Sequence, residues 1–188
     1  MARTTVLAFC GSLRARSLNL AMLQLAERMA PDLRFVGASV LPHLPLYNAD
    51  LEWDPPASVR EFRALAGAAR AVVIASPEYL HAPSGVTSNA LAWLEGLGLL
   101  YDAPVLLLSA SPGASGGLAG LVGLYPAIQQ LGAVPLDPVS ISRAESRLDA
   151  DGNVLDPAVY LRLELALDDL REAVDSPTSS RASWTLQP

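Results

Sequence analysis

The sequence predicts an α/β protein built on a parallel β-sheet that is covered by helices on both faces. Short apolar runs alternate along the chain with helix-length segments, which is the pattern of repeated strand–helix units. The runs are continuously apolar, as expected for strands buried on both faces. With 188 residues, 51% of them hydrophobic, the chain is long enough for one domain with a substantial core. We expect that domain over residues 1–175 and a loose tail over 176–188.

The first half of the chain contains three expected strands. The run VLAFC at 6–10 precedes a segment at 17–29 whose apolar residues recur every three or four positions, which predicts a helix. The second expected strand is 33–40, and after a proline-rich loop a helix is expected over 56–69, because the first turn of a helix tolerates a proline. The third expected strand, AVVIA at 71–75, is apolar throughout.

The second half continues this alternation. A helix is expected over 86–97, a fourth strand over 104–110, a helix ending near Leu131 and a fifth strand over 133–136. A hydrophilic turn region, RAESRLDADGN, leads to a last helix. Its apolar residues are three or four positions apart: Val159, Leu163, Leu167, Leu170 and Val174. Because right-handed crossovers place all strand-to-helix loops at the carboxyl edge of a parallel sheet, we expect a ligand site at that edge.

Composition narrows the classes of function. No apolar stretch approaches the roughly 20 residues of a membrane span, and the N-terminus lacks the apolar core of a signal peptide, so we expect a cytoplasmic protein without a membrane partner. A net charge of −6 without a basic stripe disfavours nucleic acid as a partner. The single cysteine, Cys10, cannot form an internal disulfide and is expected to be a small core residue. Two histidines and one cysteine leave almost no ligands for a metal, so no metal site is expected.

Three loops rich in glycine, serine and proline fall on the carboxyl edge of the expected sheet: 11–19, 76–85 and 109–117. In the first, Gly11 permits close approach of the backbone, and short polar side chains and Arg14 lie beside a helix start, where an anion is favoured. This predicts a phosphate cradle, although an ordinary turn with Ser17 as helix cap fits the same residues. The P-loop lysine motif is absent, and Leu13 stands where dinucleotide motifs have their second glycine. The terminal phosphate of a mononucleotide therefore fits best.

The other two loops offer surfaces for a flat ligand and no convincing catalytic group. SPEYLH, from Ser76, combines a rigid proline, an aromatic ring and backbone groups that suit a heterocycle or an ordinary turn. Neither Glu78, which lacks a second carboxylate at a useful spacing, nor the lone His81 is expected to be catalytic. The third loop matches the G-x-S-x-G pattern of serine hydrolases around Ser115, but no histidine follows that serine. We therefore expect a glycine-rich rim that donates N–H groups to a ligand.

Four segments resemble, in order and spacing, the NADPH-dependent FMN reductase family, which includes flavin, quinone, azo-dye and chromate reductases. They are GSLRARSLN, LPLYNADLE, SPEYLHAPSGVTSNALAWL and SASPGASGG, within about residues 4–136. The resemblance implies a flavodoxin-like three-layer αβα sandwich with a five-stranded parallel sheet in the order 2-1-3-4-5. It also implies a non-covalent FMN at the carboxyl edge, and a homodimer or homotetramer with the flavin near a subunit interface.

The same resemblance assigns residues to the FMN site. The positions that match the family's phosphate-binding residues are Ser12, Arg14, Ser17 and Asn19. The segment along the isoalloxazine ring comprises Pro77, Glu78, Tyr79 and the backbone of Leu80 and His81. The loop that lines the other side of the ring contributes Ser111, Gly113, Gly116 and Gly117.

We expect an FMN-dependent oxidoreductase that takes hydride from NADPH or NADH and passes it to a quinone, a free flavin or a similar acceptor. The flavin carries this chemistry, so no catalytic residue is expected. An alternative is a flavin-binding electron carrier or sensor without turnover. Two departures motivate it: Leu80 stands where the family commonly has Asn, and Ser88 where it commonly has Lys.

Overall fold

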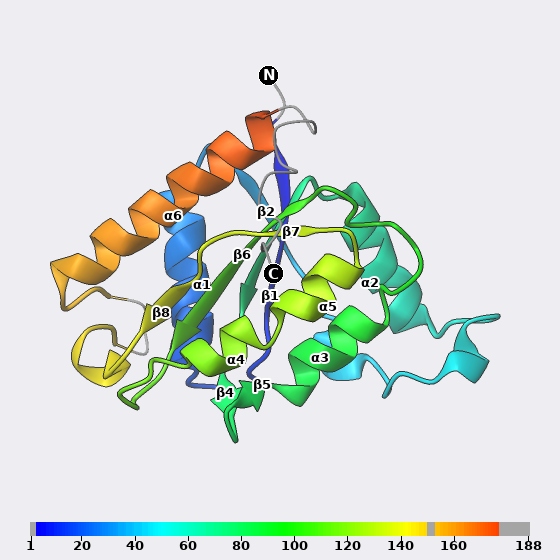
Figure 1. Cartoon of the computed structure of the whole chain (residues 1–188), viewed down its shortest axis with the longest axis horizontal. Coiled ribbons are helices and arrows are strands. Elements are labelled where there is room, and N and C mark those ends of the chain that lie inside the picture. Colours follow the sequence, from blue (N-terminus) through cyan, green and yellow to red (C-terminus); the bar gives the residue numbers. More distant parts are fainter. Residues whose placement is uncertain (1–2, 150–152, 177–188) are drawn as a thin grey trace, which may run out of the picture.

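The computed structural model describes residues 3–149 and 153–176 and contains a parallel sheet between two layers of helices (Figure 1). The strands lie in the order β2-β1-β3-β6-β7, and β8 also pairs with β6. These strands are β1 (Thr5–Cys10), β2 (Arg34–Gly37), β3 (Ala71–Ala75), β6 (Pro104–Ala110), β7 (Val134–Pro135) and β8 (Val139–Ile141). Every pairing among them is parallel, which confirms the predicted flavodoxin-like fold class.

The fifth strand position is divided between two short strands. β7 pairs with the beginning of β6, and β8 pairs with its end. β7 ends at Pro135, and Pro138 precedes β8. Because proline has no N–H to donate to a strand ladder, the chain leaves the sheet between them and returns.

Helices α1 and α6 cover one face of the sheet, and the other helices cover the opposite face (Figure 1). The helices are α1 (Leu18–Met29), α2 (Ala57–Ala68), α3 (Gly85–Ala92), α4 (Leu118–Val122), α5 (Tyr125–Gln130) and α6 (Pro157–Asp175). Short 3₁₀ turns are η1 (Leu41–His43), η2 (Ala49–Leu51) and η3 (Ala144–Ser146). Within the described ranges no helix is long and apolar enough to cross a membrane. Of the expected tail, residues 177–188 lie outside the described residues.

Two predicted helices differ from expectation. The helix expected over 86–97 ends at Ala92, ahead of Gly96 and Gly98, whose positive φ angles of 73° and 63° a right-handed helix does not accept. The helix expected to end near Leu131 is divided into α4 and α5. Pro126, in the first turn of α5, has no N–H to continue the bonding pattern of the preceding helix.

Alternate residues of each strand pack against the two helical layers. In β1, Val6 and Ala8 share a core with α1 and α6, whereas Leu7 and Phe9 share a core with α2 and α3. β3 is buried along its whole length. This two-sided burial explains the continuously apolar strands of the sequence.

Candidate functional site

A pocket of about 380 Å³ lies where the loops after β1, β3 and β6 come together, a volume in the range of small-molecule sites. All three predicted loops and the segment after β8 contribute to it. Its lining residues are Ser12, Arg14, Arg16, Ser17, Leu18, Asn19, Pro77, Glu78, Tyr79, Ala110, Ser111, Pro112, Glu145, Leu148 and Asp149. The remaining residues of the predicted site lie outside this lining: Leu80, His81, Gly113, Gly116 and Gly117.

Gly11 brings the first loop into contact with the base of the second. A Cβ atom at Gly11 would lie 2.0 Å from Thr87 Oγ1 and 2.5 Å from Ser84 Oγ. Thr87 Oγ1 is 2.9 Å from the hydroxyl oxygens of both Ser84 and Ser76, and all three side chains are buried. We call these three residues the hydroxyl cluster. The close backbone approach expected at Gly11 is therefore made to this cluster.

Two arginines lie at the pocket beside the start of α1. Arg14 and Arg16 are exposed, and neither guanidinium makes a hydrogen bond or ion pair with another residue of the described ranges. Their charges are available to an anion, next to the N–H groups that the first turn of a helix leaves without intrahelical partners. Glu145 and Asp149 also line the pocket, so its charge is mixed.

Ser17 and Asn19 already have structural partners. Ser17 Oγ accepts a hydrogen bond from Leu20 N at 3.3 Å, which confirms the capping role considered for it. The buried Asn19 donates from Nδ2 to the carbonyl of Ala110 at 3.1 Å and accepts from the Ala110 N–H at 3.0 Å. Asn19 therefore ties α1 to the end of β6, and a phosphate contact from either side chain stays a prediction.

Cys10 lies beneath the first loop and packs against the core, as predicted. Burial raises the pKa of its thiol, while hydrogen bonds from the Ser12 backbone and the Ser17 side chain act in the opposite direction. The raised pKa leaves little thiolate at neutral pH, so Cys10 is a poor nucleophile.

The second loop forms a β-hairpin that the sequence did not predict. Its strands are β4 (Glu78–Tyr79) and β5 (Ala82–Pro83), joined by Leu80 and His81 with φ angles of 53° and 58°. Tight hairpin turns with two positive φ angles usually carry Asn or Gly. Leu80 and His81 are neither, so these two residues did not indicate a turn here. Leu80 is 99% exposed and His81 is largely exposed, which places both side chains at the hairpin tip.

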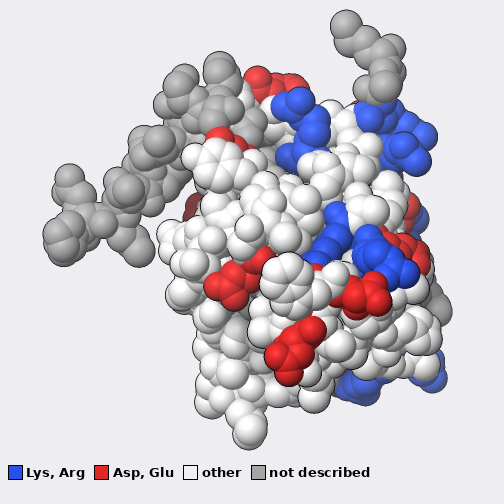
Figure 2. Space-filling model, turned by 90° about the vertical axis from the view of Figure 1, so that its right-hand side faces the viewer, with Lys and Arg blue, Asp and Glu red and all other residues white. Residues whose placement is uncertain are grey.

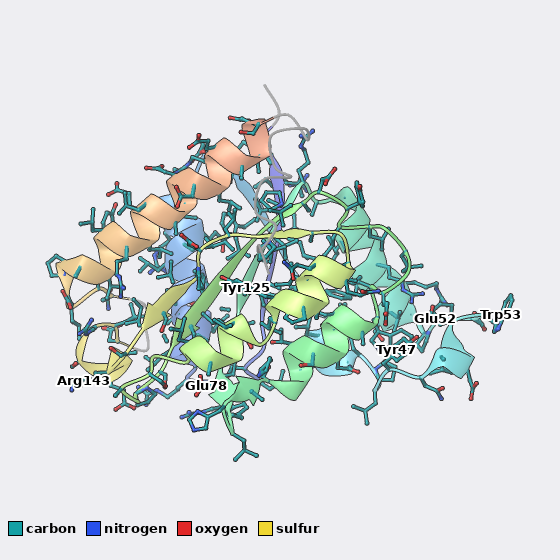
Figure 3. All side chains as sticks on the ribbon, viewed as in Figure 1. Tyr47, Glu52, Trp53, Glu78, Tyr125 and Arg143 are labelled. Carbon is teal, nitrogen blue, oxygen red and sulfur yellow. The ribbon has the colours of Figure 1, made fainter. Side chains whose placement is uncertain are left out.

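Glu78 connects the hairpin to α4, as its labelled side chain below that helix shows (Figure 3). Its Oε2 accepts a hydrogen bond from the Gly120 N–H at 3.0 Å, and its Oε1 lies 3.1 Å from Nδ1 of His81. Both carboxylate oxygens thus have partners within the protein.

The glycines of the third loop pack against strands. Gly116 and Gly117 have positive φ angles of 67° and 84°, and a Cβ atom at either would lie within 2.3 Å of a hydroxyl oxygen, of Ser140 or Ser109 respectively. Ser111 is the predicted residue of this loop that lines the pocket. Ser111 thus lies at the pocket, and the N–H donation expected from the glycines of this rim stays a prediction.

The G-x-S-x-G pattern does not form a hydrolase triad. Ser115 Oγ accepts a weak hydrogen bond from Gly117 N at 3.5 Å and makes none to either histidine, both of which are described. His81 pairs with Glu78, and His43 lies in η1. Ser115 thus lacks the general base that an acyl-transfer mechanism requires.

Several lining residues were missed by sequence reasoning. Arg16 lies in the first loop, whereas Glu145, Leu148 and Asp149 belong to the segment interpreted as a hydrophilic turn. The pairing of β8 with the end of β6 brings that segment to the pocket. No local pattern indicates this, because it depends on the divided fifth strand. Among the described residues no group of three or more His, Cys, Asp or Glu side chains is placed to hold a metal ion.

A second hollow, of about 580 Å³, lies between α1 and β2. It shares Ser12 and Arg14 with the first pocket, and its other walls are mostly apolar. Neither the second nor the third loop contributes to it. The 380 Å³ pocket is therefore the one that all three predicted loops line.

Comparisons with known proteins agree with the predicted family and fold. The family model for NADPH-dependent FMN reductase matches residues 4–146. An NAD(P)H-dependent FMN reductase of Pseudomonas aeruginosa is 34% identical over 156 residues, which cover 80% of this chain and 84% of that protein. A 2-hydroxy-1,4-benzoquinone reductase of Burkholderia sp is 30% identical, covering 84% and 89% of the two chains. Among solved structures, the flavoenzyme NAD(P)H:(acceptor) oxidoreductase FerB of Paracoccus denitrificans has a TM-score of 0.81 at 26% identity, covering 92% and 97%.

Proposed function

Because the chain belongs to the NADPH-dependent FMN reductase family, we propose that it passes hydride from NADPH or NADH to FMN in the 380 Å³ pocket, and from FMN to a quinone or a free flavin. The chain is an oxidoreductase that uses FMN and a nicotinamide donor. The observation that carries the assignment of the pocket is the meeting of three loops beside a helix start and two arginines that have no partner within residues 3–149 and 153–176.

The arginine end of the pocket suits the FMN phosphate. Arg14 and Arg16 bring two positive charges without partners among the described residues, and Ser12 adds a hydroxyl. The first N–H groups of α1 point toward the same end, where the helix dipole favours negative charge. Charge-assisted hydrogen bonds of this kind are the strongest that a pocket can offer to a phosphate.

The other end of the pocket suits the flat ring system. Pro77 and Tyr79 line it from the hairpin, and Ser111 and Pro112 line it from the third loop. When bound there, FMN accepts and releases hydride, and the protein has to hold and shield it. The two loops would orient the ring and exclude water from one face, which requires no acid or base from the chain.

The acceptor that we favour is a quinone. Two of the relatives are named as a 2-hydroxy-1,4-benzoquinone reductase and, in Pseudomonas putida, as a quinone reductase. A small flat acceptor can replace the nicotinamide on the exposed face of the ring, so that one site serves both half-reactions.

We also propose that the protein is a homodimer or homotetramer. Residues 44–56 form an arm, and Trp53 at its tip is 97% exposed and points away from the molecule (Figure 3). The arm is held firmly, because both carboxylate oxygens of Glu52 bond to Arg63 at 2.9 and 2.7 Å. Figure 2 looks onto this face, where acidic and basic side chains lie at the centre among residues of other kinds. Light scattering should give a mass for the wild-type protein that is two or four times the 19.8 kDa of one chain. Trp53→Arg should lower this mass, because it would disrupt the interface. An unchanged mass in the variant would remove the arm from the interface.

The absorption spectrum of the purified protein tests the proposed function first. A flavin spectrum and release of FMN on denaturation are expected, followed by oxidation of NADPH or NADH with benzoquinone as acceptor. A flavin-containing protein without such turnover would instead be an electron carrier or sensor. A protein that binds no FMN would contradict the assignment of the pocket.

A further inference from the structure

We propose that Glu78 is a positioning residue, which fixes the distance between the hairpin and α4 and thereby the wall against which the flavin ring lies. The inference rests on the proposed function, because it assigns a role within the same pocket. It concerns the side chain of Glu78, a residue that the resemblance to the family assigns to the segment along the ring.

The carboxylate of Glu78 is committed to the protein. Its side chain is 10% exposed, and its two oxygens are taken up by the Gly120 N–H at 3.0 Å and His81 Nδ1 at 3.1 Å. A carboxylate that accepts from a backbone N–H makes a charge-assisted hydrogen bond, stronger than a neutral one. Glu78 therefore holds the hairpin to a helix that lies 42 residues further along the chain.

The hairpin also lies directly against two glycines of α4, Gly120 within the helix and Gly123 at its end. A Cβ atom at Gly120 would be 3.0 Å from the Cβ and 3.1 Å from the Cα of Glu78. A Cβ atom at Gly123 would be 3.1 Å from the ring of Pro83. The lack of a side chain at Gly120 and Gly123 lets the hairpin lie close to α4, and the Glu78–Gly120 hydrogen bond opposes its moving away.

The base of the hairpin is held separately by the hydroxyl cluster of Ser76, Ser84 and Thr87, on which Gly11 rests. Glu78 and the hydroxyl cluster hold the flank and the base of the hairpin, and its tip, Leu80 and His81, is exposed. Pro77 and Tyr79, which flank Glu78 in the chain, line the pocket. A shift of Glu78 would therefore move both of them, and the ring wall with them.

Titration of the apoprotein with riboflavin and with FMN, followed by flavin fluorescence, tests this role. Glu78→Ala removes the hydrogen bond, and Gly120→Ala pushes the hairpin outward without removing a charge. Each should raise the Kd of both flavins by the same factor, about tenfold, because the ring is common to both ligands. Glu78→Gln, which keeps an oxygen to accept from Gly120, should stay within about twofold of the wild type.

The visible spectrum of the saturated proteins adds a readout that a loss of stability would not move. In Glu78→Ala and Gly120→Ala the bound flavin should shift toward the spectrum of free flavin, and in Glu78→Gln it should not. Asp32→Ala is the control, because both carboxylate oxygens of Asp32 also have a partner, Arg171 at 2.9 and 2.8 Å, and Asp32 lies outside the pocket. It should change neither the Kd nor the spectrum.

Three results would overturn the inference. Wild-type riboflavin affinity in Glu78→Ala would show that the wall does not depend on Glu78. A loss in Glu78→Gln as large as in Glu78→Ala, with Gly120→Ala unaffected, would mean that the charge of Glu78 acts on the ring directly. A loss in Asp32→Ala equal to that in Glu78→Ala would mean that general destabilisation is being measured. Failure of the wild-type protein to bind either flavin would contradict the proposed function instead.

Discussion

The loop before α1 and the hairpin after β3 line the same pocket, but the protein holds them in different ways. The loop presents Arg14 and Arg16, which are exposed and have no side-chain partner in the described part of the chain. The hairpin is fixed at its flank by Glu78 and at its base by the hydroxyl cluster. One end of the pocket offers charge, and the other offers a preset shape.

This difference separates two sources of affinity. Exposed charges attract a phosphate through interactions that salt screens over a Debye length of about 10 Å at 0.1 M. A preset wall instead reduces the ordering cost of binding a flat ring, and that gain does not depend on ionic strength. FMN, which has both a phosphate and a ring, should use both sources, whereas riboflavin should use only the second.

The largest effect is expected where the two regions touch. Gly11→Ala would place a Cβ atom 2.0 Å from Thr87 Oγ1 and 2.5 Å from Ser84 Oγ, and so disrupt the hydroxyl cluster. We expect the free energy of unfolding to fall by about 3 kcal/mol. Urea denaturation measures this, with Gly37→Ala as control, because nothing lies within 4 Å of a Cβ at that strand end. Equal stability of the two variants would mean that the first loop does not rest on the cluster.

The next effect distinguishes the two ends of the pocket. Combining Ser17→Ala with Arg14→Ala removes a hydroxyl and a charge at the loop, and should weaken FMN binding about 100-fold. Riboflavin, which lacks the phosphate, should lose no more than about twofold. Calorimetric titration with both ligands checks this prediction. Equal losses for the two flavins would place the phosphate elsewhere.

A smaller effect is expected at the hairpin tip. Leu80 has a φ of 53°, a conformation that costs a leucine more than an asparagine. Leu80→Asn should therefore raise the free energy of unfolding by about 0.5–1 kcal/mol, and urea denaturation measures it. Leu46→Asn, a change of the same kind at an exposed leucine without a positive φ, is the control. A drop in stability of the Leu80 variant would mean that the tip leucine makes contacts that the single chain does not show.

The smallest effect lies far from both regions. Arg171 bonds to Asp32 and holds the pKa of that carboxyl below its ordinary value. The pair therefore contributes its full stabilisation when the pH is above the ordinary pKa of an aspartate. As the pH falls through the lowered pKa, Asp32 is protonated and this contribution is lost. Asp32→Asn should cost about 0.5 kcal/mol at pH 7 and nothing in strong acid. A pH-independent difference would indicate that the charge is not the cause.

The fold could be predicted because its signals are local and repeated. The continuously apolar runs at β1, β3 and β6 follow from burial on both faces, and the positions of the three loops follow from right-handed crossovers. The division of the fifth strand could not be predicted with the same ease. Pro135 and Pro138 are visible in the sequence, but whether the chain returns to the sheet after them depends on packing against β6.

The candidate site was predicted in outline and not in detail. The loops that meet at the pocket were identified from their composition, but the side-chain partners were not. Asn19 bonds to Ala110, and Glu78 bonds to Gly120, across 91 and 42 positions of sequence. Such pairings arise only when segments far apart in the sequence are brought together by the fold. The hairpin was not predicted, because Leu80 and His81 are unusual residues for its turn.

The measurement that most directly tests the division between charge and shape is a titration of the apoprotein with FMN and with riboflavin at about 0.1 M and about 1 M salt, between which the Debye length falls to about 3 Å. The Kd for FMN should rise with salt and approach that for riboflavin, which should stay constant. Parallel weakening of both ligands, or riboflavin binding as tightly as FMN at low salt, would contradict the account.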